Sequence, residues 1–316
     1  MTKIPVIIDC DTGRDDALSI WLALALGFDV QAVVASYGNT TLENVCENSA
    51  RVLALAGRSD IPVWQGESHP SCLHRGIEEI LLPKQEGAGN GLCNLELPRS
   101  GRQVEKLGAC ERAAELARIS ERRGPVDYVI LGPATNFAAT CAALGEKAPH
   151  VISRVTMMGG KLSTLWDEMP GADFNLACDP FAVQELLRQG YRHGFPVRFV
   201  PMNVTWPIVL DMDELLLLKA VSVIAQTAKD LMIVHARHFA PEPVFRFHDP
   251  CVILSLTHDQ YFKTYRGQVN CDEIHSDWAR LQECHEGLPF CIFEADSGFR
   301  ALLLNEILER LQIKRT

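Results

Sequence analysis

Apolar and polar positions alternate along the first 200 residues in a way that predicts strands followed by helices. Short runs that are apolar throughout are typical of buried strands, and apolar residues spaced three and four apart are typical of helices. The predicted strands are 4–8, 30–36, 126–131, 155–158 and 197–200, and the predicted helices are 15–26, 42–56, 135–144 and 180–187. The pattern therefore predicts an α/β fold with an open, mostly parallel sheet and helices on both faces, resembling a Rossmann arrangement.

The rest of the chain departs from this alternation. Residues 65–101 carry prolines, glycines and the run GAGNG, and we expect so long a segment to form a flap over a functional site. The C-terminal third predicts helical additions: 214–239 is mostly helical, and a strand at 290–294 precedes a helix at 297–311. Because we find no repeat and no linker, we expect a single domain over residues 1–316.

Composition and charge exclude several classes of protein. The chain has 30 Lys and Arg against 40 Asp and Glu, a net charge of −10 that disfavours binding to nucleic acid or to an anionic membrane. The longest apolar run, 17–28, is too short to span a bilayer, and the start lacks the pattern of a secretion signal. Eleven cysteines without a CxxC pair are typical of a reducing compartment. We therefore expect a cytoplasmic protein.

Four carboxylates, Asp9, Asp11, Asp15 and Asp16, lie within eight residues where the first predicted strand ends. Ligands of open α/β sheets bind at the carboxyl ends of the strands. Four anions in one loop repel one another, and a bound divalent cation stabilises their charged forms. Asp15 and Asp16 would also suit the N-terminus of the next helix, but Asp9 and Asp11 come before it. The segment therefore predicts a metal site.

The ligand types restrict which metal is expected. Carboxylate and carbonyl oxygens suit calcium or magnesium rather than zinc. An EF-hand is excluded, because Gly13 and Arg14 occupy the fifth and sixth positions counted from Asp9. His235 and His238 are three residues apart on a predicted helix, but without a third nitrogen or sulfur ligand they are weak support for zinc.

Further short motifs lie at predicted strand ends or before a predicted helix. They are Tyr-Gly-Asn at 37–39, Leu-Gly-Pro-Ala-Thr-Asn at 131–136, Met-Gly-Gly at 158–160, Ala-Asp-Phe-Asn at 172–175 and Phe-His-Asp-Pro at 247–250. Together with the acidic opening, and in this order, they resemble the nucleoside hydrolases, the inosine-uridine preferring nucleoside N-ribohydrolase family. The resemblance runs from Asp9 to Asp249.

The resemblance implies a calcium ion and a reaction. The ion would be held by Asp11, Asp16, Asp249 and the backbone carbonyl of Leu131, with Asp9 orienting the ligands. The expected reaction is hydrolysis of the N-glycosidic bond of a ribonucleoside to ribose and free base. Asp11 would take the proton of a water activated with the metal, and the transition state would resemble an oxocarbenium ion.

The resemblance also assigns contacts to the substrate. His248 is expected to protonate or hydrogen-bond the leaving base. The residues expected to bind the ribose or line its pocket are Asp15, Asn39, Asp167, Asp173 and Asn175. Members of the family are commonly dimers or tetramers, so the resemblance implies a homodimer or homotetramer.

Three positions depart from the family pattern. Asp173 stands where Glu is usual, Asp167 corresponds to a usual Asn, and Glu86 stands where the flap commonly has His. The missing flap imidazole leaves the preference between purine and pyrimidine bases open. Residues expected to compete for contact with the base are Trp166, Trp206, Phe245 and Arg246.

Two alternatives are consistent with parts of the pattern. A magnesium-dependent phosphatase of the haloacid-dehalogenase type would use Asp9 as nucleophile and Asp11 as acid, but it needs a later acidic pair and a lysine that we do not find well placed. A non-catalytic nucleoside- or ribose-binding protein would explain the three altered pocket positions. Retention of Asp11, the metal ligands and His248 argues against it.

Overall fold

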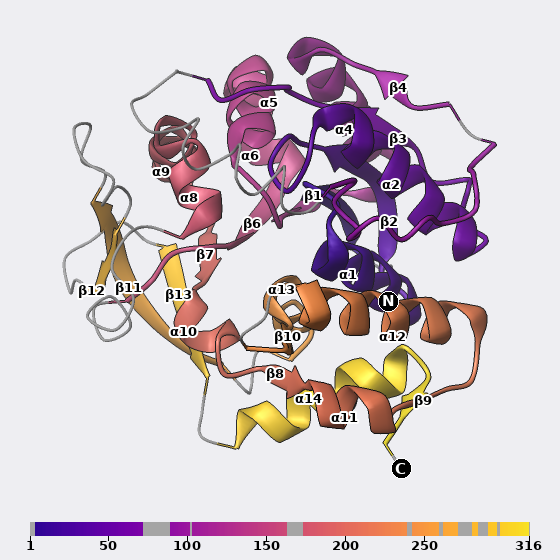
Figure 1. The fold of residues 1–316 in the computed structure, drawn as a ribbon. Coiled ribbons are helices and arrows are strands. Elements are labelled where there is room, and N and C mark those ends of the chain that lie inside the picture. The colour runs from indigo at the N-terminus through magenta and orange to yellow at the C-terminus, as the bar shows by residue number, and fades with distance from the viewer. Residues whose placement is uncertain are drawn as a thin grey trace.

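The computed structural model describes residues 4–71, 89–101, 103–162, 173–238, 242–258, 262–270, 280–283, 290–295 and 298–315. Within them a ten-stranded sheet forms the centre of the fold, with the strand order β12-β11-β13-β7-β6-β5-β1-β2-β3-β4 (Figure 1). The strands from β13 to β4 are parallel, and β11 is antiparallel to both of its neighbours. The strands are β1 (Pro5–Cys10), β2 (Asp29–Ala35), β3 (Val63–Gln65), β4 (Glu105–Lys106), β5 (Val126–Ile130), β6 (Ile152–Met158), β7 (Val197–Val200), β11 (Phe262–Asn270), β12 (Arg280–Glu283) and β13 (Phe290–Ala295).

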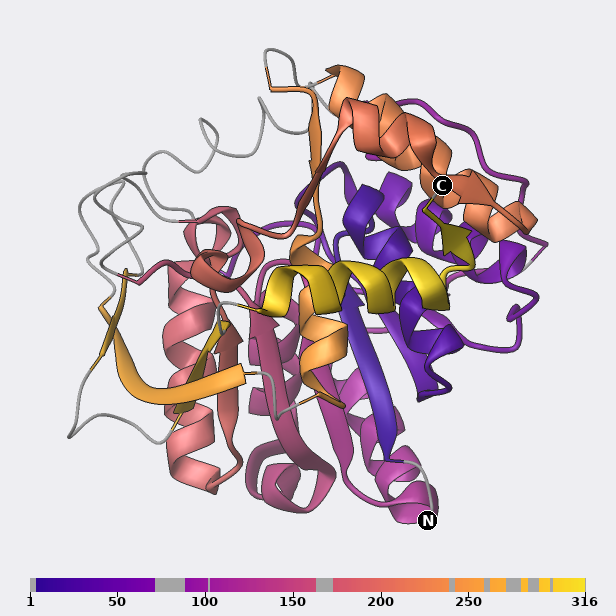
Figure 2. The same cartoon turned by 90° about the horizontal axis from the view of Figure 1, so that it is seen from below.

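Helices cover both faces of this sheet, because its strands are apolar on both sides. Ile8 of β1 belongs to one buried cluster and Ile7 to the other. The helices packed with Ile8 are α1 (Arg14–Ala25), α2 (Leu42–Leu55), α12 (Val223–His238), α13 (His248–Ser255) and α14 (Phe299–Arg310). The helices packed with Ile7 are α4 (Ala109–Arg123), α5 (Thr135–Leu144), α6 (Ala148–Val151) and α9 (Pro180–His193). In Figure 2 the yellow α14 crosses one face and the magenta and pink helices lie behind the other.

The strand order reverses at β1, and this places the candidate site. The chain leaves β1 through α1 to reach β2 on one side, and it leaves β5 through α5 to reach β6 on the other. Asp9 pairs with Val34 of β2 and with Ile130 of β5, so the carboxyl ends of these strands meet at one edge. A crevice at such a switch point is where ligands bind in open α/β sheets.

Shorter elements complete the molecule at this edge and in the C-terminal third. Two small antiparallel pairs, β8 with β10 and β9 with β14, lie outside the main sheet. These elements are η1 (Gly145–Lys147), α8 (Phe174–Cys178), α10 (Met202–Thr205), β8 (Val209–Asp211), α11 (Met212–Leu217), β9 (Lys219–Ala220), β10 (Val244–Arg246) and β14 (Ile313–Lys314). Helix α12 contacts α1 and β10, which brings the C-terminal third over the start of the chain.

The predicted fold class is confirmed, including the helical additions. Residues 214–239 are mostly helical, as predicted, but the helix is interrupted: α11 ends at Leu217, β9 follows, and α12 begins at Val223. The break has a physical reason, because β9 pairs with β14 and needs extended backbone there. Helix α4 and strands β3, β4, β11 and β12 were not predicted. Ser297, the expected start of the last helix, lies outside the described residues, and α14 begins at Phe299.

The middle of the predicted flap, residues 72–88, lies outside the described residues. The described segment after it is tied to α2 and to the loop before it: the Thr40 hydroxyl donates to the carbonyl of Gly89, and the Asn48 amide donates to the carbonyl of Asn90. The Arg14 guanidinium also approaches the carbonyl of Gly91 at 3.4 Å. Residues 89–91 therefore lie beside the acidic opening of the chain.

Candidate active site

A cavity of about 550 Å³ opens at the carboxyl ends of β1, β2, β5 and β6. A volume of this size accommodates a small organic ligand. The lining combines carboxylates with imidazole, guanidinium and aromatic groups. The lining residues are Asp11, Arg14, Asp15, Asn39, Leu131, Met158, Asp173, Phe174, Asn175, Met202, His235, Phe245, Arg246, His248 and Asp249.

Asp16 is held in place by the loop that joins β1 to α1. Its Oδ2 accepts a hydrogen bond from the backbone N–H of Gly13 at 2.8 Å and another from the Asn39 amide at 3.1 Å. Gly13 is the N-cap residue of α1, so the carboxylate also lies in the favourable first turn of the helix. A Cβ on Gly13 would lie 2.7 Å from the Asn39 amide nitrogen, which accounts for glycine at this position.

Asp11 is buried between the ends of two strands. Its Oδ2 accepts the backbone N–H of Asn39 at 2.6 Å, and this bond favours the charged carboxylate. A Cβ added at Gly38 would lie 2.1 Å from the same oxygen, and one added at Gly132 would lie 3.0 Å from Oδ1. The glycines of the Tyr-Gly-Asn and Leu-Gly-Pro motifs thus make room for Asp11.

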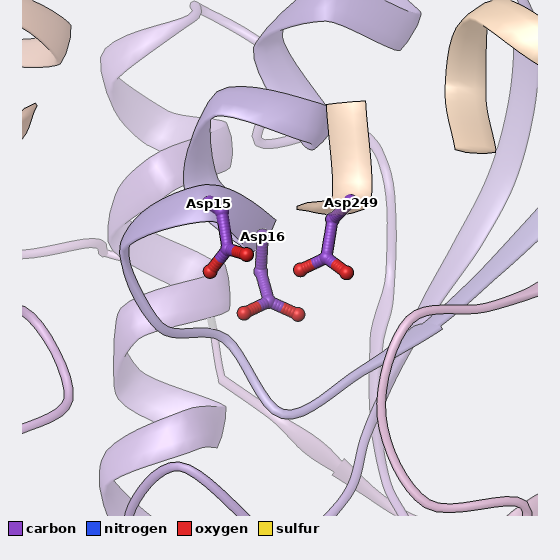
Figure 3. A group of neighbouring side chains, drawn as sticks. All are labelled: Asp15, Asp16 and Asp249. Carbon is purple, nitrogen blue, oxygen red and sulfur yellow. The ribbon is translucent and has the colours of Figure 1, made fainter. Parts of the chain in front are cut away.

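Three carboxylates converge beside Asp11. One oxygen from each of Asp15, Asp16 and Asp249 lies within 4.8 Å of the others. Figure 3 shows Asp15 and Asp16 projecting from the first turn of α1 and Asp249 approaching from α13. Three like charges at this separation repel strongly unless a cation or protons compensate them. The donors are all oxygens, so the arrangement fits a hard divalent cation.

The converging group overlaps the predicted ligand set without matching it. Asp16 and Asp249 belong to both, whereas Asp15 was predicted to contact ribose. Asp11 and the carbonyl of Leu131 line the same cavity. That carbonyl accepts a hydrogen bond from the Asn175 amide at 2.8 Å, and its second lone pair can still serve a cation.

Asp9 supports the site from behind the cavity. Its carboxylate is fully buried and accepts hydrogen bonds from the Tyr128 hydroxyl and the Asn136 amide, both at 2.9 Å. Burial raises the pKa of Asp9 to about 7, and the two hydrogen bonds oppose this rise. The contacts fix the end of β1 against β5 and α5, two residues before Asp11.

Asp173 caps a short helix at the cavity wall. Its Oδ1 accepts the backbone N–H groups of Asn175 and Leu176, and its Oδ2 accepts that of Gly160 at 2.5 Å. Burial raises the pKa of Asp173 to about 6, while these three hydrogen bonds oppose it. The shorter side chain at this family position is thus tied to the backbone of its own loop. Asn175 follows on the cavity wall.

His248 begins α13 and lies next to Asp249. Its Nδ1 shares a hydrogen bond of 2.7 Å with the Thr205 hydroxyl, which fixes the orientation of the ring. The Trp206 ring lies 6.2 Å away, centroid to centroid. Phe245 and Arg246, which the sequence suggested as base contacts, also line the cavity. Asp167, Trp166 and Glu86 lie outside the described residues.

His235 is a cavity residue that the sequence did not single out for the site. It projects from α12, and its ring lies 5.1 Å from that of Phe245. Burial, with the nearby charge of Arg14, lowers the pKa of His235 to about 3. In the sequence, His235 stands out only because His238 follows it three residues later. That spacing suggests a zinc site and does not indicate contact with an organic ligand. Arg14 and Met202 were missed as well.

Sequence comparison agrees with this geometry. The family model of the inosine-uridine preferring nucleoside hydrolases matches residues 6–285. The pyrimidine-specific ribonucleoside hydrolase of Photobacterium profundum is 32% identical over 278 residues, which cover 84% of this chain and 83% of that protein. The enzyme of the same name from Escherichia coli O127:H6 is 31% identical, with 85% and 84% covered.

Solved structures share the fold. A purine-preferring ribonucleoside hydrolase from Gardnerella vaginalis superposes with a TM-score of 0.79 at 22% identity, covering 98% of both chains. An inosine-guanosine nucleoside hydrolase gives 0.80 at 21% identity, covering 97% of this chain and 99% of that one. Among the described residues no helix is both long and apolar enough to cross a membrane. The chain belongs to the family of inosine-uridine preferring nucleoside hydrolases and is an enzyme of the N-ribohydrolase class.

Proposed function

We propose that this enzyme hydrolyses the N-glycosidic bond of a ribonucleoside to give ribose and free base. The observation that carries the proposal is the convergence of Asp15, Asp16 and Asp249 at a cavity of ligand size, which Asp11, Asp15 and Asp249 line. Membership of the family supports the same reaction. Neither the phosphatase alternative nor a binding role uses all of these groups.

The acidic residues of the site are proposed to hold a calcium ion. The ligands would be Asp11, Asp16, Asp249 and the Leu131 carbonyl, and the convergence of Asp15 on two of them makes it a further candidate. Their oxygen-only chemistry supports calcium. When bound, the cation would supply positive charge that holds ribose hydroxyls and acidifies a nearby water.

Asp11 is proposed as the general base. Its hydrogen bond from the Asn39 backbone favours the carboxylate form, which can accept the proton of the attacking water. The new bond forms between the water oxygen and the anomeric carbon, while the C–N bond breaks and its electron pair moves to the base. Asp9 would keep the end of β1 in position for this step.

The remaining groups are proposed to bind the two halves of the substrate. Asp15, Asn39 and Asn175 line the cavity and suit ribose hydroxyls. Asp173 also lines the cavity, but its cap interactions commit both of its oxygens to backbone donors. A ribose contact through Asp167 stays a prediction. His248, with Nδ1 engaged by Thr205, would present Nε2 to the leaving base.

Three further expectations remain predictions: a single domain, a cytoplasmic location and a homodimer or homotetramer. The base preference is also open, since the sequence relatives are named pyrimidine-specific and a structural relative is named purine-preferring.

The test is release of base and ribose, measured by chromatography, from a panel of purine and pyrimidine ribonucleosides with calcium present. Asp11→Asn keeps the size of the side chain but loses the proton acceptor, so we expect turnover to fall by about 10³-fold. The melting temperature of the variant serves as the control for folding. If nucleosides raise the melting temperature of the wild type but no base is released, the protein binds nucleosides without hydrolysing them.

A further inference from the structure

Arg246 occupies a defined place in the lining of the cavity. It ends β10, two residues before His248, and lines the cavity. The carbon at the centre of its guanidinium group lies 3.9 Å from the centroid of the Trp206 ring. At this distance a guanidinium group is attracted to the face of the ring, so Trp206 restricts its orientation. The Trp206 ring also neighbours that of His248, which groups the three side chains.

The guanidinium group is only weakly neutralised. Its ion pair with Glu242 is 3.3 Å long, and the Glu242 side chain is 76% exposed, so solvent screens the interaction. The buried Nε of Arg246 has no hydrogen-bond acceptor among the described residues. Because arginine has five N–H donors and no acceptor, it retains donors for a ligand in the cavity.

The groups near Arg246 define what kind of ligand atom it can meet. His235 and Phe245 line the same cavity, and the low pKa of His235 leaves its imidazole neutral. The proposed reaction binds ribose through the aspartates and the base through His248, whose ring neighbours the same Trp206 that holds Arg246. The ribose therefore faces the carboxylates, and the base faces Arg246 and His248.

We infer that Arg246 binds the leaving base through the oxygen or ring-nitrogen acceptors of the base, and that it favours bases with a carbonyl group where cytosine and adenine have an amino group. This inference rests on the proposed function. As the C–N bond breaks, the electron pair moves onto the base, and a fixed cation stabilises that negative charge. A base that presents a carbonyl oxygen accepts the guanidinium N–H groups. A base with an amino group at the same position places its own N–H donors against those of the guanidinium group, so no hydrogen bond forms there.

The experiment compares kcat and KM of the wild type with those of Arg246→Gln, Arg246→Lys and Glu242→Gln. The substrates are uridine against cytidine, inosine against adenosine, and 4-nitrophenyl β-D-ribofuranoside, whose leaving group needs no assistance. We expect Arg246→Gln to lower kcat/KM for uridine and inosine by about 10- to 100-fold, with a smaller loss for cytidine and adenosine. Cleavage of the nitrophenyl riboside should stay within about threefold, since its leaving group is already stable as an anion.

Two variants sharpen the assignment. Arg246→Lys keeps the charge but loses the planar fork, so we expect an intermediate loss for the carbonyl bases. Glu242→Gln is the matched control, because it removes the exposed partner and leaves the guanidinium donors intact. Its rates should equal those of the wild type.

The outcomes separate the inference from the proposed function. Equal losses for all five substrates, or no loss for uridine and inosine, would overturn the role of Arg246 while the wild type still hydrolyses nucleosides. No base release by the wild type from any nucleoside, with the nitrophenyl riboside also intact, would overturn the proposed function and the inference with it.

Discussion

Two groups of residues at the cavity are held in different ways. In the acidic group, Asp11 and Asp16 are buried and accept backbone N–H groups from the loops that follow β2 and β1. In the second group, Arg246 and His248 are positioned through the side chains of Trp206 and Thr205. The first arrangement depends on the sheet itself, and the second depends on side-chain packing in the C-terminal third.

This difference suggests that the two groups of residues serve different parts of the substrate. Groups held by the backbone of the central strands keep their geometry regardless of which base enters the cavity. Groups held by other side chains can be exchanged without disturbing the sheet. Substitutions in the acidic group should therefore affect all nucleosides alike, and the effect of those in the second group should depend on the base.

Asp16→Asn should have the largest effect. The amide keeps the shape and can still accept the Gly13 and Asn39 hydrogen bonds, but it removes one negative charge from the proposed calcium site. We expect the calcium concentration for half-maximal activity to rise by at least about 100-fold, for every nucleoside. Calcium titration of activity measures this. Asp60→Asn is the control, because Asp60 lies just before the amino end of β3, away from the site, and its calcium requirement should not change. An unchanged calcium requirement in Asp16→Asn would contradict the assignment of Asp16 as a calcium ligand.

Gly38→Ala should lower the rate of hydrolysis by displacing the Asp11 carboxylate. The added Cβ would meet the Asp11 carboxylate and force it to move, and a displacement of this kind costs about 100-fold in kcat. Gly101→Ala is the matched control, because a Cβ there meets nothing within 4 Å. Steady-state kinetics on two nucleosides with different bases should show the same loss for both. A loss of activity for only one of the two nucleosides would contradict the claim that the acidic group affects all nucleosides alike.

His235→Gln should give the smallest effect and a base-dependent one, below about tenfold in kcat/KM. It should also change the pH dependence of stability. The pKa of His235 is lowered from 6.5 to about 3, so the unfolded chain takes up a proton that the folded chain does not. Stability is therefore lost as the pH falls from about 6.5 toward 3. The melting temperature should drop less between pH 7 and pH 4 in the variant, and an equal drop would contradict this role of His235.

Elements that follow from local patterns were predictable from the sequence. The central strands and their helices are apolar runs with clear ends, and α5 begins and ends where it was predicted. Helix α4 was missed because its buried stripe contains Arg112. That side chain is buried only through its bonds to Glu67, Thr140 and the carbonyl of Leu107, which lie elsewhere in the sequence.

Most of the acidic group was predictable for a similar reason. Asp11, Asp15 and Asp16 are close together in the sequence and Leu131 directly follows β5, so the parallel sheet brings them to one edge. Asp249 begins a helix in the C-terminal third, and only the family resemblance predicted it. His235 was not predictable as a cavity residue, because only the packing of α12 against α1 and β10 brings it there. The cap made by Asp173 likewise depends on Gly160, which belongs to the turn after β6.

The most direct test of the account is the rate of base release by enzyme freed of metal with a chelator and then titrated with calcium, with bound metal measured in the same samples. If the aspartates hold a cation that the reaction requires, the chelated enzyme should release no base from its best nucleoside, and activity should return in proportion to bound calcium. Full activity in samples without bound metal would contradict the account.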